Sequence, residues 1–139
     1  SDYGASWSAV ETPVFHGSAA SGIATLAVRD PFNLLAAGGD IGDPNGHTDN
    51  VATSSDGGIT WTLAHRPAMS GAIYGSAYVP NAPTPSVVLV SPKGAAVSTD
   101  NGTTWASFDT RSYWAVGFAT SGTGWMVGPG GRITKVETR

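Results

Sequence analysis

One eight-residue pattern recurs along the chain and constrains its fold more than any other feature. Residues 54–61 read SSDGGITW and residues 98–105 read STDNGTTW. A shortened copy, DYGASW, occupies residues 2–7, with Ser in the place of Thr. Three copies of S-x-D-x-G-x-T-W within 139 residues indicate that one structural unit is repeated.

Each copy predicts a hairpin corner held together by its own side chains. Asp-Gly and Asn-Gly pairs, here at residues 56–57 and 101–102, are typical of tight turns because Gly and Asn tolerate positive φ. The Asp carboxylate can accept hydrogen bonds from the turn, and the Trp offers a large apolar face to a neighbouring sheet. We therefore predict a structural role for the pattern residues, which are Asp2, Gly4, Trp7, Ser54, Asp56, Gly58, Thr60, Trp61, Ser98, Asp100, Gly102, Thr104 and Trp105.

The pattern resembles the Asp-box, or bacterial neuraminidase repeat (BNR), which joins the third and fourth strands of β-propeller blades. Sialidases and photosystem II stability/assembly-factor-like proteins (WD40/YVTN/BNR-like) carry it. Further runs, LAVRD at 26–30, GGD at 38–40 and GWMVGPGGRI at 124–133, resemble the second group. The resemblance implies the C-terminal part of an all-β propeller. It also implies that the box lies at the outer edge, far from the central channel where ligands bind.

The composition suits an all-β protein and narrows its partners. The chain has 19 Gly, 9 Pro and only 12% charged residues, which is typical of many short strands joined by turns. Its net charge of −3, without a run of Lys or Arg, argues against nucleic acid. The absence of Cys excludes disulfides and thiolate metal sites. No apolar run reaches the length of a membrane span.

The compartment is not fixed by these features, although a secreted or periplasmic location is favoured. No signal peptide is visible, but the chain begins inside a repeat. We therefore expect residues before Ser1 to be missing from this sequence.

Spacing of the apolar runs predicts about three four-stranded antiparallel blades within one segment, residues 1–139. Residues 1–12 are predicted to end in the last strand of a blade, over 6–12. Two blades at 21–65 and 70–109 follow, and 112–137 supplies three strands of a final blade. Twelve strands result, with the box hairpins between third and fourth strands.

Three blades are too few to close a ring, since about four is the smallest number seen. The remaining blades are expected from the same precursor, as part of a larger propeller or as another fragment. The alternative is a second copy, which would give a homodimer with a six-bladed ring.

A ligand site is predicted where the first strand of each blade begins, at the rim of the channel. Aromatic and small polar side chains around a concave mouth suit a glycan or a peptide, although the aromatic residues could instead fill the channel wall as core. The predicted rim residues are Ser21, Ser70, Tyr74, Arg111, Tyr113 and Trp114.

The acidic loop between residues 40 and 50 is the one candidate for a cation. Asp40, Asp43 and Asp49 could offer oxygen ligands to calcium, but the same residues are common turn formers and the spacing is not that of an EF-hand. No cofactor is predicted.

No catalytic residues are assigned, because the chain lacks the Arg-Ile-Pro segment of sialidases and a well-placed pair of carboxylates. The sequence thus favours a non-catalytic binding or assembly scaffold with a protein partner. The alternative is a carbohydrate-active propeller, either a lectin or a sialidase/glycosidase-like hydrolase.

Overall fold

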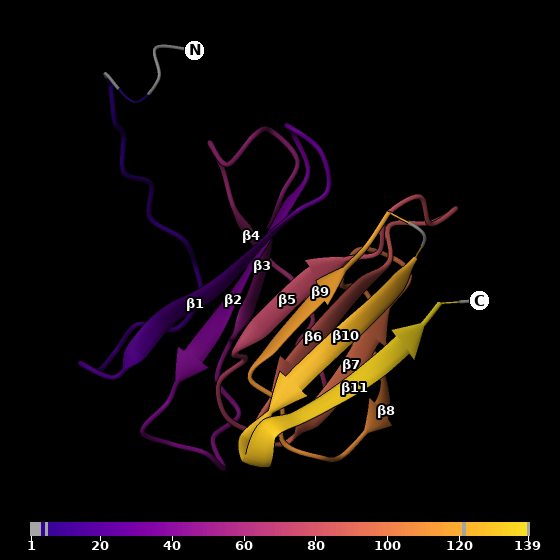
Figure 1. Cartoon of the computed structure of the whole chain (residues 1–139). Coiled ribbons are helices and arrows are strands. Elements are labelled where there is room, and N and C mark those ends of the chain that lie inside the picture. Colours follow the sequence, from indigo (N-terminus) through magenta and orange to yellow (C-terminus); the bar gives the residue numbers. More distant parts are fainter. Residues whose placement is uncertain (1–3, 5, 121, 139) are drawn as a thin grey trace.

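The structure, a computed structural model, describes residue 4, residues 6–120 and residues 122–138. Within these residues, eleven strands form three separate antiparallel sheets (Figure 1). One 3-10 helix, η1 (Pro129–Gly131), joins the last two strands. No helix in this part of the chain is long and apolar enough to cross a membrane.

Each sheet is a meander in which chain order is also spatial order. The first sheet contains β1 (Ser21–Val28), β2 (Leu34–Asp40), β3 (Val51–Ser54) and β4 (Thr62–Leu63). The second contains β5 (Gly75–Tyr78), β6 (Val87–Ser91), β7 (Gly94–Ser98) and β8 (Ala106–Asp109). The third contains β9 (Ala115–Phe118), β10 (Thr123–Gly128) and β11 (Arg132–Glu137).

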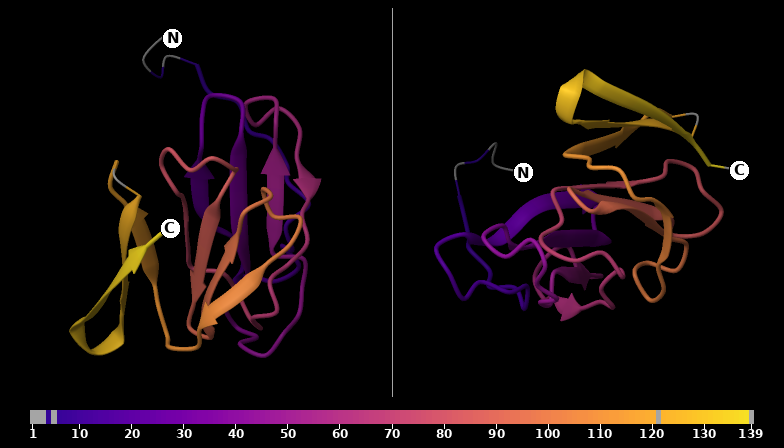
Figure 2. Two further views of the ribbon diagram at one scale, coloured as in Figure 1. Left: turned by 90° about the vertical axis from the view of Figure 1, so that its right-hand side faces the viewer. Right: turned by 90° about the horizontal axis from the view of Figure 1, so that it is seen from below.

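The three sheets are arranged as adjacent blades of a propeller. Their first strands are neighbours, since β1 lies against β5 and β5 against β9. Figure 2 shows the sheets as separate layers set at angles to one another. The prediction of an all-β propeller segment with three blades is therefore confirmed.

Two apolar cores fill the boundaries between blades. The first joins Leu35 and Val51 of the first blade to Val87 and Leu89 of the second. The second joins the other face of the second blade to Tyr113, Met126 and neighbouring residues of the third. Strand β6 supplies both cores because successive side chains point to opposite faces of a sheet, and all five of its residues are buried.

The predicted strand over residues 6–12 is not observed. A β-strand needs a hydrogen-bonding neighbour. The three-stranded sheet of the last blade lies across the molecule from this segment (Figure 1). Trp7 is 89% exposed and Val10 is 48% exposed. The described residues thus contain eleven strands, one fewer than predicted.

The two ends of the row of blades expose apolar faces. On the first blade, Leu26 lies in register with the buried Ala36 on the face turned away from the second blade. On the third blade, Val127 pairs with Ile133, and both are exposed. Between two blades such a face is covered by the neighbouring blade. At the two ends of the row the apolar side chains are exposed to solvent instead.

Candidate functional site

The strand register places the Asp-boxes and the predicted rim at opposite ends of the blades. In the first blade Ser21 pairs with Asp40 at one end, while Val28, Leu34 and Ser54 are aligned at the other. The box therefore begins at the end of β1 and the rim at its start. The second blade has the same arrangement, with Ser98 aligned to the end of β5.

Both complete boxes use their carboxylate inside their own turn. Asp56 accepts from the hydroxyl of Ser54 at 2.8 Å and of Thr60 at 2.5 Å, and from the Thr60 N–H at 2.9 Å. Asp100 likewise accepts from the Ser98 hydroxyl at 2.7 Å, from the Thr104 N–H at 2.8 Å and from the Thr104 hydroxyl at 2.6 Å. These hydrogen bonds, above all those from Thr60 and Thr104, lower the pKa of each Asp to about 2. A carboxylate held in this state is a poor general acid.

The first, shortened box keeps the corner conformation of the complete ones. Gly4, Gly58 and Gly102 have φ of 86°, 87° and 87°. In each copy a Cβ at this Gly would lie 3.3 to 3.6 Å from the six-membered ring of the Trp three residues later. The Gly and the indole are thus packed alike in all three copies, while Asp2 lies outside the described residues.

At the other end, Tyr74 and Trp114 immediately precede β5 and β9. The Tyr74 N–H donates to the Val90 carbonyl at 2.9 Å, and the Trp114 N–H to that of Val127 at 2.7 Å. The two inner strands approach closely, since a Cβ on Gly75 would lie 2.9 Å from the Cα of Ala115. Tyr74 and Trp114 are therefore brought to one end of the channel wall, where Trp114 is 53% exposed.

Arg111 and Tyr113 share one carboxylate rather than forming an open rim. The Arg111 guanidinium contacts Asp109 at 2.5 Å, and its Cζ lies 6.0 Å from the centre of the Tyr113 ring. The Tyr113 hydroxyl donates to Asp109 at 2.9 Å and shares a second hydrogen bond with the hydroxyl of Thr134 at 3.1 Å. The bond from Arg111 is the main cause that lowers the pKa of Asp109 well below its usual range. Tyr113 is fully buried, so it is a core residue and does not face the rim.

Ser21 and Ser70 support the loops behind the rim. Ser21 donates its hydroxyl to the Ser18 carbonyl at 2.9 Å, and Ser70 donates to the Pro44 carbonyl at 3.1 Å. A small cavity of about 30 Å³ lies beside Ser70, lined also by Asp40, Tyr74 and Lys93. The bond from Ser70 to Pro44 and the shared cavity link the loop of the first blade to the segment that leads into the second.

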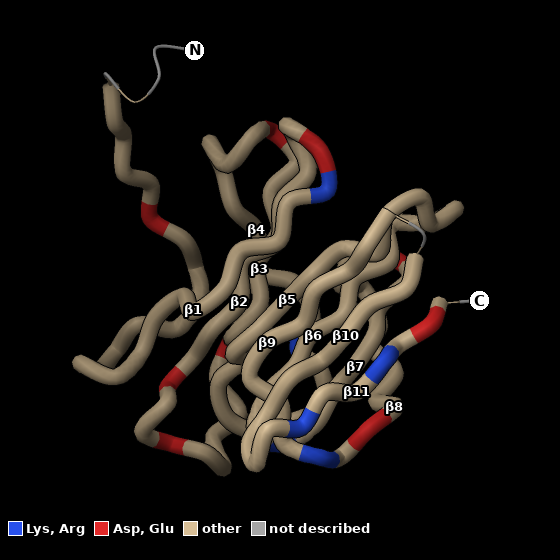
Figure 3. The backbone as a smooth tube through the Cα atoms, viewed as in Figure 1, with Lys and Arg blue, Asp and Glu red and all other residues tan. Residues whose placement is uncertain are grey.

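Two basic residues that were not predicted join this end of the molecule. Lys93 lies in the turn between β6 and β7 and donates to Asn45 at 3.3 Å. Arg132, just after η1, donates to the Ser112 carbonyl at 3.2 Å. The turns after the second strand of a blade lie at the same end as the start of its first strand, which the alternation of an antiparallel meander could have revealed. Basic segments lie at this end of the second and third blades, with an acidic one beside them, whereas acidic residues mark the loop of the first blade (Figure 3).

The carboxylates of the acidic loop bind their own backbone. Asp40 accepts from the Gly42 N–H at 2.8 Å and from the Ser18 hydroxyl at 3.0 Å. Asp43 accepts from the Asn45 N–H at 3.3 Å. Across the described residues, no group of three or more His, Asp or Glu side chains is placed to hold a metal ion. The geometry is that of turns closed by Asp side chains.

Comparison with known proteins agrees with the repeat and the fold. The family model of the BNR/Asp-box repeat matches residues 52–63. No curated protein matches the chain. YCF48 bound to D1 peptide is similar in structure, with a TM-score of 0.67 and 16% identity over 92% of this chain and 40% of that one. An ancestral GH74 enzyme has a TM-score of 0.52 and 15% identity over 75% of this chain and 16% of that one.

The fold, the repeat and these likenesses define a segment of an Asp-box β-propeller. The chain is similar in fold both to YCF48 and to a propeller enzyme, and it spans less than half the length of either.

Proposed function

We propose that the chain is a non-catalytic binding scaffold whose rim holds an extended segment of a partner protein. The observation that carries the proposal is the exposed Trp114, whose backbone lies against that of Gly75, the residue after Tyr74. Tyr74 and Lys93 line one small cavity, and Arg132 is bonded to Ser112, two residues before Trp114. An aromatic platform beside cations suits a peptide that carries aromatic or apolar side chains and carboxylates. The similarity to YCF48 bound to D1 peptide supports a peptide as the ligand class.

The test is calorimetric titration with a set of short synthetic peptides that differ in charge and aromatic content. Acidic, aromatic peptides are expected to bind, and Trp114→Ala is expected to weaken binding at least tenfold. Arg132→Glu is expected to weaken acidic peptides more than neutral ones, because it reverses one charge at the site. The matched control is Arg29→Glu, a reversal of an exposed charge at the box end of the first blade, opposite the rim, which should leave binding unchanged. Equal loss in both charge variants would contradict a rim site.

A carbohydrate-active propeller is the second candidate. Trp114 could stack on a sugar ring, and the fold is similar to that of an ancestral GH74 enzyme. A glycosidase needs a carboxylic acid with a raised pKa, whereas the Asp109 carboxyl near the rim has a lowered one. We therefore place lectin activity above hydrolysis. A glycan array with a fluorogenic glycosidase panel separates the two, and turnover that depends on Asp40 or Asp49 would overturn the scaffold proposal.

The pattern residues of the Asp-boxes are proposed to serve stability alone, at the end of the blades opposite the rim. The scaffold also needs further blades. They would come from a longer precursor or from a second copy in a six-bladed ring, since three blades do not close.

A further inference from the structure

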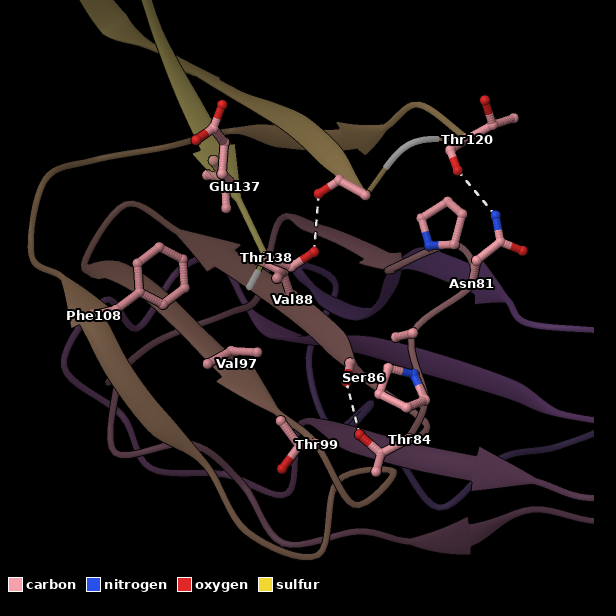
Figure 4. Close-up of a pocket in the computed structure, with 15 residues that line it drawn as sticks. Asn81, Thr84, Ser86, Val88, Val97, Thr99, Phe108, Thr120, Glu137 and Thr138 are labelled. Carbon is pink, nitrogen blue, oxygen red and sulfur yellow. Dashed lines mark hydrogen bonds between the residues drawn. The ribbon is translucent and has the colours of Figure 1, made fainter.

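A hollow lies between the second and third blades, on their outer side. This cavity of about 630 Å³ is bounded by the turn at residues 80–86, by β7 and β8, and by the end of β11 (Figure 4). Apolar side chains of both blades line it, namely Val88, Val97, Phe108 and Val136. Phe108 is 45% exposed there.

The cavity borders the end of β11, which is the outer strand of the third sheet. In the first and second sheets a fourth strand, β4 or β8, pairs with the third. In the third sheet the described residues provide only β9, β10 and β11, so the outer edge of β11 is open. An open edge offers unpaired N–H and C=O groups to another strand.

The second blade shows what a fourth strand brings to such a boundary. Trp105, at the end of its box, packs against the core that includes Ala64 of the preceding blade. Its indole N–H donates to the His65 carbonyl at 2.6 Å. Ala64 stands three residues after the box Trp61, and Phe108 stands three residues after Trp105. A box Trp delivered to the third sheet would therefore meet Phe108, which lines the cavity.

One segment of the chain has the matching sequence and forms no strand in its own molecule. Residues 6–12 follow the shortened box, whose Gly4 and Trp7 already have the box packing. Trp7 is nonetheless exposed, and the segment forms no strand. Within one molecule it runs beyond the first blade, on the far side from β11 (Figure 1).

We propose that residues 6–12 of a second copy occupy this cavity and pair with β11 as the fourth strand of the third blade. The exchange is reciprocal, so two copies complete each other's third blade. The inference rests on the second-copy form of the assembly proposed above and names the segment that joins the copies.

The strand register specifies the contact. The residue after the box Trp pairs with the third strand at Thr62↔Thr53 in the first sheet and at Ala106↔Val97 in the second. Thr53 and Val97 are in turn paired with Leu35 and Val88, one position before the last residues aligned across the first three strands, which are Ser54 and Ser98 in the third strands. In the third sheet the last residues aligned across all three strands are Phe118, Gly124 and Val136, so the same position is Lys135, paired with Trp125. Ser8 of one copy thus lies opposite Lys135 of the other.

The chain contains no Cys, so this pair can be tested by a disulfide. Opposite residues of antiparallel strands have Cα atoms about 4.5 to 5.5 Å apart, within the range of a disulfide. Ser8→Cys and Lys135→Cys proteins, mixed in equal amounts under mild oxidation, are expected to give a covalent dimer on a non-reducing gel. The register control is Ile133→Cys, a more exposed position two residues along β11. Mixed with Ser8→Cys it should give only the background of the single variants.

Light scattering gives the second readout. The unmodified chain is expected at twice its mass of 14.1 kDa, and a chain without residues 1–12 at the monomer mass. Three results would each overturn the proposal. The first is a monomeric full chain, and the second is a disulfide within one molecule when Ser8→Cys and Lys135→Cys are combined in one chain. The third is equal cross-linking of Ser8→Cys with Lys135→Cys and with Ile133→Cys. Peptide binding at the rim is measured independently, so its failure and the failure of strand exchange are distinguishable.

Discussion

The Trp105 indole N–H donates to the carbonyl of His65 at 2.6 Å, and so ties the box of the second blade to the last residues of the first. The Trp61 indole donates instead to Gly58, within its own box, at 3.0 Å. The same motif position thus makes a bond between blades in one copy and a local bond in the other. The difference depends on whether a preceding blade is present.

Replacement of Trp105 by Phe should therefore weaken the boundary between the first two blades. We expect a loss of about 1–2 kcal/mol in the free energy of unfolding, since the carbonyl of His65 loses its partner and the smaller ring packs less well against Ala64. Urea denaturation followed by circular dichroism measures it. Trp61→Phe is the matched control and should lose less than half as much. An equal loss in both variants would show that the contact between blades contributes nothing.

Gly75 tests how closely the inner strands approach. Gly75→Ala should destabilise the protein by about 1–3 kcal/mol, because the new Cβ would lie 2.9 Å from both the Ala115 Cα and a Val90 methyl. Gly117→Ala, on the adjacent inner strand, places a Cβ with no neighbour within 4 Å and should be close to neutral. Thermal unfolding of the two variants gives the comparison. A neutral Gly75→Ala would mean that β5 and β9 are farther apart than described.

Tyr113→Phe should cost about 1–2 kcal/mol of stability, because the hydroxyl that joins Asp109 to Thr134 is removed from a buried position. A double-mutant cycle with Thr134→Val isolates the bond between the two hydroxyls from other effects of each substitution. Denaturant unfolding of the four proteins provides the coupling energy. Strictly additive losses would contradict a direct interaction.

Acid should destabilise the protein through its Asp-boxes. The pKa of Asp56 and of Asp100 is about 2 in the folded chain, against 3.8 for an ordinary Asp. A depressed folded-state pKa stabilises the fold above the unfolded value, and this stabilisation is lost as the pH falls from about 4 towards 2. The double variant Asp56→Asn, Asp100→Asn should therefore show a flatter stability profile over this range. Denaturation midpoints at several pH values measure it, with Asp43→Asn as the control, and a profile as steep as that of the unchanged chain would contradict the expectation.

The box corners and the blade repeat could be predicted because their causes are local. Gly at positive φ, an Asp two residues after a Ser, and a Trp at the start of the returning strand all act within eight residues. The spacing of apolar runs between turn residues then predicted strands, and buried β6 shows the continuous apolar run expected of a strand covered on both faces.

The rim was predicted less well because it depends on which way side chains point at strand starts. Tyr113 and Trp114 are adjacent, so one enters the core and the other faces solvent, and no local feature says which. Lys93 lies in the turn between β6 and β7 and Arg132 begins β11, so both were missed because they come to this end only through the fold of each blade. The segment 6–12 was predicted as a strand from its own sequence, but strand formation requires an edge that its own molecule places elsewhere.

The exposed faces at the two ends of the row of blades are not alike, one centred on Leu26 and the other on Val127 and Ile133. Contact between copies through these faces would therefore be directional, head to tail, and each added copy would be rotated by the same angle. Two copies close a ring only when that rotation amounts to half a turn. Substitutions at Leu26 or Ile133 that change the angle would leave the last contact unmet, and association would then continue into an open helical polymer.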